Sequence, residues 1–177
     1  PDIALVTETD KDTYKIRQKV NINSFITNLT SAKTYQNLIL TTSAKDPSGA
    51  EVFQKNTVIA GLSPSGSVQL TETWNTSGLP TDGTYTITQT IFSNSMLITN
   101  SSKLITLEKA PDFTIAVSSD YQKIKQGERA TYTAYLEPVN GWNSAIKLNM
   151  EGLPSGASAS FNPGSLIPPG EAITVVI

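Results

Sequence analysis

The sequence predicts an all-β protein made of two tandem antiparallel β-sandwich domains, residues 1–109 and 110–177. Apolar and β-branched residues recur with period two through most of the chain, which favours strands because branched side chains fit a pleated surface. Turn-forming runs such as Asp46-Pro47-Ser48-Gly49 separate these segments at short intervals. The pattern breaks around Glu108 to Asp112, so we expect a short, stiff linker there.

Seven segments of the first domain have the length and alternation of strands. The clearest is Thr84 to Phe92, in which Tyr85, Ile87 and Ile91 share one face and threonines occupy the other. This pattern is typical of a half-buried antiparallel strand. The connection from Ser31 to Asn37 has the residues for one helical turn, but no segment shows sustained helical periodicity. The other six predicted strands are Ile3 to Thr7, Val20 to Asn28, Leu38 to Asp46, Glu51 to Val58, Ser67 to Trp74 and Leu104 to Leu107.

Strand-like runs resume after the linker and define the second domain. They are Phe113 to Val117, Ala130 to Leu136, Ile146 to Met150, Ala157 to Phe161 and Ile173 to Ile177. A short internal repeat supports two related β-domains in tandem. Its matched residues are Asp12, Lys15, Ile16, Arg17 and Gln18 in the first domain and Asp120, Lys123, Ile124, Lys125 and Gln126 in the second.

The second domain is short for a sandwich of about 100 residues, and its final run, Ile173 to Ile177, has no polar tail. We therefore interpret the chain as a fragment of a longer one, with the second domain truncated at its C-terminus. An unpaired strand edge exposes backbone donors and acceptors. We expect either the following chain or a partner protein to add the missing strand at this C-terminal edge.

Composition excludes several classes of function. The chain has no Cys and no His, which excludes a thiol nucleophile, a disulfide, a Cys/His zinc site and a Ser/His/Asp triad in this segment. Charged residues are 16% of the chain and the net charge is −2, whereas 19 Ser and 23 Thr give a surface rich in hydroxyls. The dispersed basic residues form no stripe for nucleic acid. No apolar run reaches the roughly 18 residues of a membrane span, and the residues from Pro1 onward lack the basic and apolar regions of a signal peptide.

Five pieces of the second domain resemble, in order, the immunoglobulin-like modules of bacterial and archaeal extracellular proteins. They are Asp112 to Ile115, Gln126 to Thr133, Pro138 to Trp142, Gly152 to Gly156 and Ser160 to Pro163. In such modules a further Gly-Thr-Tyr-like strand usually follows the region that matches Ile173 to Ile177. The resemblance implies a place beside secreted peptidases, glycosidases or adhesins, on the cell surface or outside the cell. It does not specify a function.

The first domain resembles a recurrent surface module more loosely. The matching pieces are Asp10 to Tyr14, Asp46 to Gly49, Thr73 to Thr76 and Gly83 to Tyr85. It departs from the pattern at Arg17-Gln18-Lys19, where the family usually carries Gly followed by an acidic residue. The chain as a whole thus resembles tandem immunoglobulin-like or fibronectin-III-like modules, and no catalytic residue is implied.

An acidic cluster near the first turn is the candidate metal site. Glu8, Asp10 and Asp12 stand at alternate positions, and oxygen-rich clusters of this kind bind calcium. A calcium loop normally adds a Gly turn and a distant bidentate Glu, which are not evident here. We prefer a solvated strand end and assign no metal.

Trp74 and Trp142 are candidates for stacking on a sugar, but we prefer core packing for both. Trp74 ends an alternating run with Val68 and Leu70, and Trp142 stands where the resembled module places an apolar plug. A sugar platform usually needs several coplanar exposed rings, and only 7% of the residues are aromatic.

Three further patterns are weighed and not assigned. Glu72 with Asp82 is an example of the carboxylate pairs that a glycosidase needs about 5–10 Å apart, but no spacing selects a pair. Lys11 or Lys15 with Asn100 has the residue types for an intramolecular isopeptide bond, although surface roles are the simpler interpretation. Triplets that match the N-glycosylation pattern begin at Asn28, Asn75 and Asn100, and they arise readily by chance in a chain this rich in Asn, Ser and Thr.

We therefore expect a non-catalytic structural or spacer module of a larger extracellular or cell-surface protein, with no catalytic residue, metal or cofactor. Its expected partners are the neighbouring domains of the same chain and possible strand-donating chains. One alternative is an adhesion or carbohydrate-binding module. Another is an assembly subunit of a filament or surface layer that is completed by strand donation.

Overall fold

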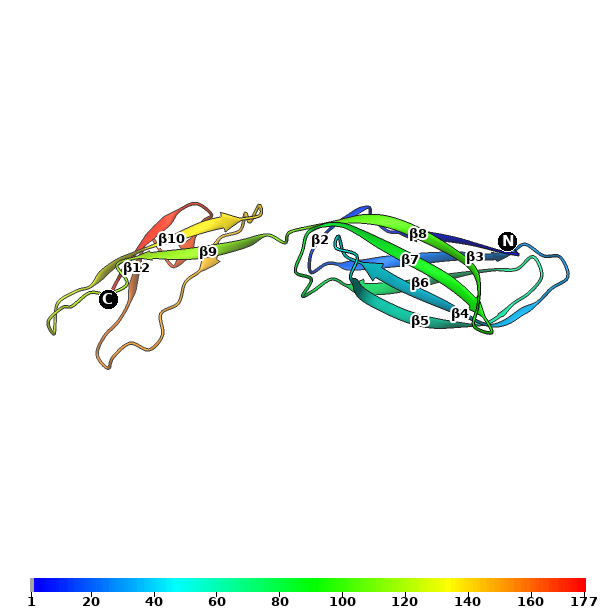
Figure 1. The fold of residues 1–177 in the computed structure, drawn as a ribbon. Coiled ribbons are helices and arrows are strands. Elements are labelled where there is room, and N and C mark those ends of the chain that lie inside the picture. The colour runs from blue at the N-terminus through cyan, green and yellow to red at the C-terminus, as the bar shows by residue number, and fades with distance from the viewer. Residues whose placement is uncertain (1) are drawn as a thin grey trace. The chain divides into compact units, whose positions relative to one another are not determined.

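The computed structural model describes residues 2–177, which form strands, turns and loops (Figure 1). This confirms the all-β sandwich prediction. The chain divides into two compact units, called here the first domain, which ends at Ala110, and the second domain, Pro111–Ile177. The described residues contain no helix with the length and apolar character needed to cross a membrane.

Two sheets pack face to face in the first domain. One has the strand order β1(Ile3–Thr9)-β3(Lys19–Asn28)-β6(Ser67–Asn75), and its pairs are antiparallel. The other has the order β2(Thr13–Lys15)-β8(Met96–Glu108)-β7(Gly83–Ser93)-β4(Tyr35–Lys45)-β5(Glu51–Leu62). All its pairs are antiparallel except β2 with β8, which is a short parallel pair. The seven predicted strands are therefore present, with β2 added.

The predictions fail where local sequence lacks alternation. β8 begins at Met96, whereas the predicted strand began at Leu104. The prediction missed the first half of the strand because its polar run, Thr99 to Lys103, does not alternate. Hairpin pairing with β7 holds this half in place, from Gln89↔Ser101 to Ser93↔Met96. The predicted helical turn between Ser31 and Asn37 is absent, because residues 31–32 form a bend and β4 begins at Tyr35.

Asp46 shows how the sequence sets a turn. One oxygen of its carboxylate, Oδ1, accepts hydrogen bonds from the backbone N–H groups of Ser48 and Ala50, each at 2.9 Å. Gly49 follows with φ +87°, a left-handed conformation that glycine adopts without a steric penalty. The turn therefore joins β4 to β5 through interactions encoded within five residues.

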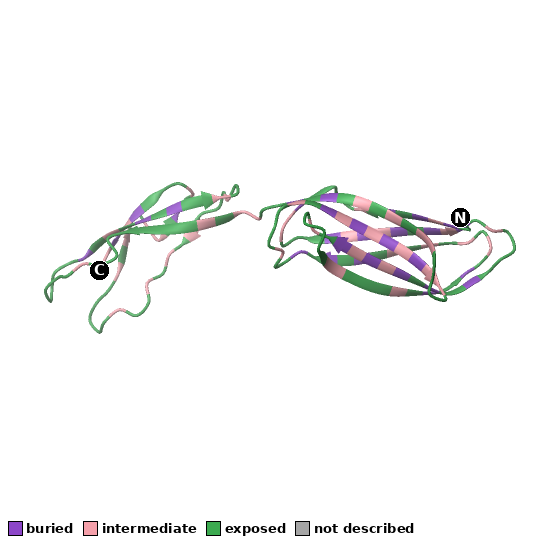
Figure 2. Cartoon of the chain, in the orientation of Figure 1, coloured by how far each residue is buried: buried purple, intermediate pink, exposed green. Residues whose placement is uncertain are grey.

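Two apolar clusters fill the core of the first domain, one toward each end of the sandwich. One contains Ile3, Leu5, Ile26, Tyr35, Leu38, Leu40, Ile59, Leu62 and Ile91. The other contains Tyr14, Val20, Ile22, Ala44, Trp74, Tyr85, Ile87, Ile105 and Leu107. Figure 2 shows the corresponding alternation of buried and exposed positions along the strands.

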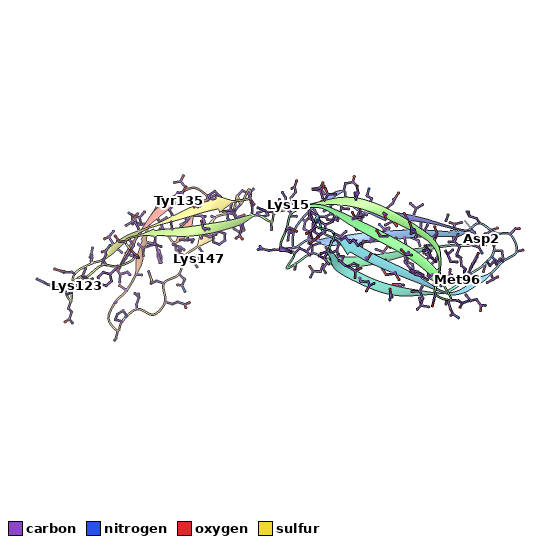
Figure 3. All side chains as sticks on the ribbon, in the orientation of Figure 1. Asp2, Lys15, Met96, Lys123, Tyr135 and Lys147 are labelled. Carbon is purple, nitrogen blue, oxygen red and sulfur yellow. The ribbon has the colours of Figure 1, made fainter. Side chains whose placement is uncertain are left out.

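The second domain has a four-stranded sheet and a separate strand pair. The sheet has the order β9(Asp112–Ser118)-β10(Thr131–Val139)-β14(Ala172–Val176)-β12(Ser160–Asn162), and the pair joins β11(Ile146–Lys147) to β13(Leu166–Ile167). Strand β11 is shorter than predicted and ends at Lys147, which is labelled in Figure 3. The core consists of Ala134, Leu136, Ile167, Ile173 and Val175.

The prediction of an open edge beside Ile173 to Ile177 is wrong. Strand β14 lies inside the sheet, because it pairs with β10 on one edge and with β12 on the other. Its backbone donors and acceptors are therefore engaged on both sides along residues 174–176.

The two domains share part of one topology. The antiparallel order β9-β10-β14 repeats β1-β3-β6, and the pair β11–β13 repeats β4–β5. In the first domain, the hairpin β7–β8 lies beside β4 and completes the second sheet. Within residues 111–177, no strand takes the place of β7 or β8.

Candidate functional site

One acid of the cluster near the first turn, Asp10, forms a structural latch with Tyr14. The carboxylate of Asp10 accepts hydrogen bonds from the hydroxyl of Tyr14, at 2.7 Å, and from the backbone N–H of Asn21, at 3.0 Å. Partial burial acts to raise the pKa of Asp10, but these hydrogen bonds outweigh it and the pKa is lowered. Burial, together with the hydrogen bond to Asp10, raises the pKa of Tyr14 to about 12. The pair therefore ties the β1–β2 turn to β3 with Asp10 ionised and Tyr14 neutral.

The other two acids of the cluster lie apart from this latch. Asp12 forms an ion pair with Lys103, with 2.6 Å between Oδ1 and Nζ, and Glu8 is exposed on β1. Across residues 2–177, no three His, Cys, Asp or Glu side chains are grouped so that they could hold a metal ion.

Trp74 is a core residue, as the alternation of its strand predicts. Its side chain is only 2% exposed, and its ring lies 5.7 Å from the ring of Phe53 and 5.9 Å from that of Tyr85. Trp142 is half-buried, with its ring 4.9 Å from that of Phe113, and its indole N–H donates to the carbonyl of Ser144. Trp74 therefore offers no exposed ring face to a sugar.

Glu72 and Asp82 do not line a shared cleft. Glu72 is 2% exposed on β6, where its Oε1 accepts a hydrogen bond from the hydroxyl of Thr57 and its Oε2 is buried with no hydrogen-bond partner. Asp82 lies at the surface, with its Oδ1 3.9 Å from Nζ of Lys109. One carboxylate is enclosed in the core and the other is in solvent, so they are not arranged as a glycosidase pair.

A buried polar layer separates the two apolar clusters of the first domain. Gln89 is fully buried at its centre, and its carbonyl oxygen accepts a hydrogen bond from the hydroxyl of Thr7 at 2.9 Å. Its amide nitrogen donates to the hydroxyls of Ser24, at 2.7 Å, and Thr42, at 3.0 Å. These four residues, called here the polar layer, join strands of both sheets.

Sequence reasoning missed the polar layer, although one signal was available. Gln89 stands at an inward position of β7, between Ile87 and Ile91, where the alternation demands a buried side chain. A buried amide needs partners, because burying a polar group without them is costly. Inward-facing hydroxyls on neighbouring strands were the candidates to supply them.

The residues considered for an isopeptide bond are not brought together. Nζ of Lys15 lies 2.5 Å from Oε2 of Glu108, whereas Asn100 pairs with Thr90 further back on β8. Asn100 precedes Glu108 by 108 − 100 = 8 residues, about 27 Å along the strand at roughly 3.4 Å per residue. Lys11 instead places its ammonium 5.9 Å from the centroid of the Tyr14 ring.

The glycosylation triplets are in different environments. Asn28 is 1% exposed, and its amide nitrogen donates to the backbone carbonyls of Lys33, Ser63 and Leu62 at 2.7, 2.9 and 3.3 Å. Because this nitrogen is enclosed, Asn28 is not a glycan acceptor in the folded domain. Asn75 and Asn100 are exposed.

An apolar row crosses the outer face of the five-stranded sheet. Val58, Ile39, Phe92 and Leu97 are opposite one another on β5, β4, β7 and β8 in turn. Val58 and Leu97 are 68% and 57% exposed. Met96, which precedes Leu97 at the hairpin turn and is labelled in Figure 3, is 70% exposed. Directly opposed side chains on one sheet face lie about 4.5–5.5 Å apart, so these four form a continuous strip.

An apolar groove of about 350 Å³ opens in the second domain. Ile115 and Val117 of β9 line it, together with Ala134 of β10 and Val175 of β14. Leu148 and Met150, which follow β11, and Phe161 form its other wall. The β9, β10 and β14 residues are on one sheet face, because Val117 is opposite Ala134 and Val175 is opposite Tyr132, two residues before Ala134.

Comparisons with known proteins identify no family. No protein-family model and no curated protein matches the sequence. Among solved structures, the CARDB domain of the PF1109 protein from Pyrococcus furiosus, in complex with di-metal ions, is 13% identical with a TM-score of 0.48. That match covers 61% of this chain and 89% of the other.

Two larger proteins match with lower scores. The Pseudomonas fluorescens alkylpurine DNA glycosylase AlkC, bound to DNA containing an abasic site analog, is 10% identical with a TM-score of 0.44, over 60% of this chain and 30% of that one. The β-glucosidase from Listeria innocua, in complex with isofagomine, is 9% identical with a TM-score of 0.41, over 59% of this chain and 16% of that one. Likenesses at these identities do not assign a function to this chain.

Proposed function

We propose that this chain is a non-catalytic structural or spacer module of a larger extracellular or cell-surface protein, built from tandem immunoglobulin-like or fibronectin-III-like domains. The observation that carries the proposal is that side chains considered for metal binding, catalysis or glycosylation instead hold the fold together. Asp10 anchors Tyr14, Glu72 is enclosed in the core, and Asn28 binds three backbone carbonyls. The hydroxyl-rich composition and the resemblance of the sequence to surface modules support the location.

The strand arrangement suits a domain that transmits force. The chain enters the first domain through β1 and leaves it through β8 (Figure 1). Tension between these ends would load the antiparallel pairs β1–β3 and β7–β8 along the strand direction. Many hydrogen bonds would then share the load, as a spacer under tension requires.

Single-molecule pulling through the two ends of the chain tests the structural role. We expect the first domain to unfold in one step, with a gain in contour length of up to roughly 36–40 nm for 110 residues at 3.3–3.6 Å each. Trp74→Ala, which opens a cavity in the core, should lower the unfolding force. Extension without a resolvable force peak would contradict the proposal.

An adhesion module is the second candidate, and the apolar row on the outer sheet face favours it. Exposed apolar strips on soluble proteins often mark interaction sites. Binding of the chain to arrays of immobilised glycans and peptides, compared with Val58→Ser, distinguishes the two roles. Saturable binding that Val58→Ser weakens tenfold or more would support adhesion, and its absence would leave the structural role as the stronger proposal.

A further inference from the structure

The groove of the second domain occupies the place that a β-hairpin fills in the first domain. Strand β4 has neighbours on both edges, β5 on one and β7 on the other. Its counterpart β11 pairs only with β13, and Leu148 extends this pairing by donating its N–H to the carbonyl of Ser165 at 2.8 Å. Among the strands of residues 111–177, none pairs with the opposite edge of β11.

The inner face of the large sheet is uncovered at the corresponding place. In the first domain, β8 packs across β1, whose inward residues Ile3 and Leu5 are 0% and 9% exposed. On β9, the inward residues Ile115 and Val117 are 36% and 53% exposed. Yet Val117 is directly opposite Ala134, which is only 2% exposed. The groove is therefore core surface that lacks an opposing layer.

We propose that this groove binds a β-hairpin with alternating apolar side chains, supplied by a polypeptide segment outside residues 1–177. The first strand of the hairpin pairs antiparallel with the free edge of residues 146–150, as β7 pairs with β4. The second strand lies over β9, as β8 lies over β1. This inference deepens the proposed function and rests on it, because it names the partner that completes a structural module.

Two strands are needed, and their pattern follows from the groove. Neighbouring strands are about 4.8 Å apart, so a single strand beside Leu148 and Met150 would leave Ile115 and Val117 uncovered. In the first domain the gap between β4 and β1 is filled by both β7 and β8. Side chains alternate along a strand, so every second residue of the hairpin must be apolar.

A second copy of this chain is a poorer occupant than an external hairpin. Its own hairpin, β7–β8, has Tyr85, Ile87 and Ile91 completely buried within the first domain. Donating that hairpin would expose these side chains and break its pairing with β4. A segment that is free of such contacts carries no such penalty.

The test appends a second copy of residues 76–108 directly after Ile177, which reproduces the loop and hairpin that follow β6 in the first domain. Hydrogen exchange of residues 112–118 and 146–150 is compared between the extended chain and the 177-residue chain. We expect at least tenfold slower exchange at both segments in the extended chain. The matched control carries Ser in the appended hairpin at the positions that copy Ile87, Ile91 and Ile105, and should give no added protection.

A substitution in the groove tests whether the added protection comes from binding there and not from nonspecific contact. Val117→Asp changes a half-exposed side chain, so the chain should keep its fold, and in the extended chain it should remove the added protection. Unchanged exchange in the extended chain, or protection that survives Val117→Asp, would overturn the proposal. So would dimerisation of the 177-residue chain in sedimentation, if Val117→Asp restores the monomer, because the occupant would then be a second copy. The unfolding force of the first domain does not depend on the groove, so failure of this inference is distinct from failure of the structural role.

Discussion

The first and second domains have matching strands but differ in what covers them. β1 and β9 are both first strands, and each pairs antiparallel with the strand that follows it in its sheet. Leu5 on β1 is buried under a second sheet, whereas Val117 on β9 is open to solvent. The alternation of a strand therefore determines which face is apolar, but the opposing sheet determines whether that face is buried.

The two domains also differ in how deeply they bury a tryptophan ring, and substituting Trp74 and Trp142 measures this difference. Trp74→Ala should lower the free energy of unfolding of the first domain by about 3–5 kcal/mol, because a buried aromatic ring leaves a cavity. Trp142→Ala should cost the second domain less, since its ring is only half-buried. Urea unfolding followed by hydrogen-exchange mass spectrometry resolves both domains. Equal losses would contradict the difference in burial between the two rings.

A second substitution tests how much the polar layer stabilises the first domain. Gln89→Leu removes the partner of three buried hydroxyls, on Thr7, Ser24 and Thr42, and should cost about 1–3 kcal/mol. Gln69→Leu is the matched control, because Gln69 is exposed on β6, and it should change stability by less than about 0.5 kcal/mol. The same urea measurement applies. A neutral Gln89→Leu would mean that the layer adds no net stability.

The latch between Asp10 and Tyr14 predicts an alkaline loss of stability in the first domain. The pKa of Tyr14 is raised from 10.0 to about 12, so folding favours its neutral form. This contribution is complete below pH 10 and is lost as the pH rises through 12. Urea midpoints of the first domain between pH 9 and pH 12 should therefore fall in the wild type.

Two variants separate this latch from general alkaline denaturation. Tyr14→Phe should remove the part of the alkaline loss that Tyr14 causes, because no phenol remains to ionise. Tyr121→Phe, which removes a hydroxyl from a 77% exposed side chain, should leave that loss in place. An identical pH dependence in Tyr14→Phe and wild type would contradict the assignment.

The smallest expected effect is that of shortening Val117, and Val175 on the same sheet face of the second domain is its comparison. Val175 and Val117 both point to the inner face of the sheet, but they are 4% and 53% exposed. Val175→Ala should cost about 1.5–3 kcal/mol at most, and Val117→Ala less than about 0.5 kcal/mol. Thermal unfolding followed by circular dichroism compares the two. A large loss for Val117→Ala would show that the groove is closed in solution.

Much of the fold could be predicted from local patterns. The alternation of Thr84 to Phe92 identified β7, and the run that ends at Trp74 identified β6 and its buried ring. The first half of β8 could not be found this way, since its polar run owes its strand conformation to pairing with β7.

The candidate sites were less predictable than the strands. The sequence brought Glu8, Asp10 and Asp12 together as acids, but it did not show that Tyr14 and Asn21 would engage only Asp10. Likewise, an Asn-Leu-Thr triplet does not reveal that the amide of Asn28 lies among backbone carbonyls. Such roles depend on side chains from distant strands.

The sequence alone determined that the chain is all-β, where most of its strands lie and which face of each is apolar, because alternation and turn chemistry act over a few neighbouring residues. Only the tertiary structure decided that Gln89 finds three hydroxyl partners, that β14 is an inner strand and that Val117 faces an open groove. Burial and hydrogen bonding between sheets arise from segments tens of residues apart, so no local pattern records them.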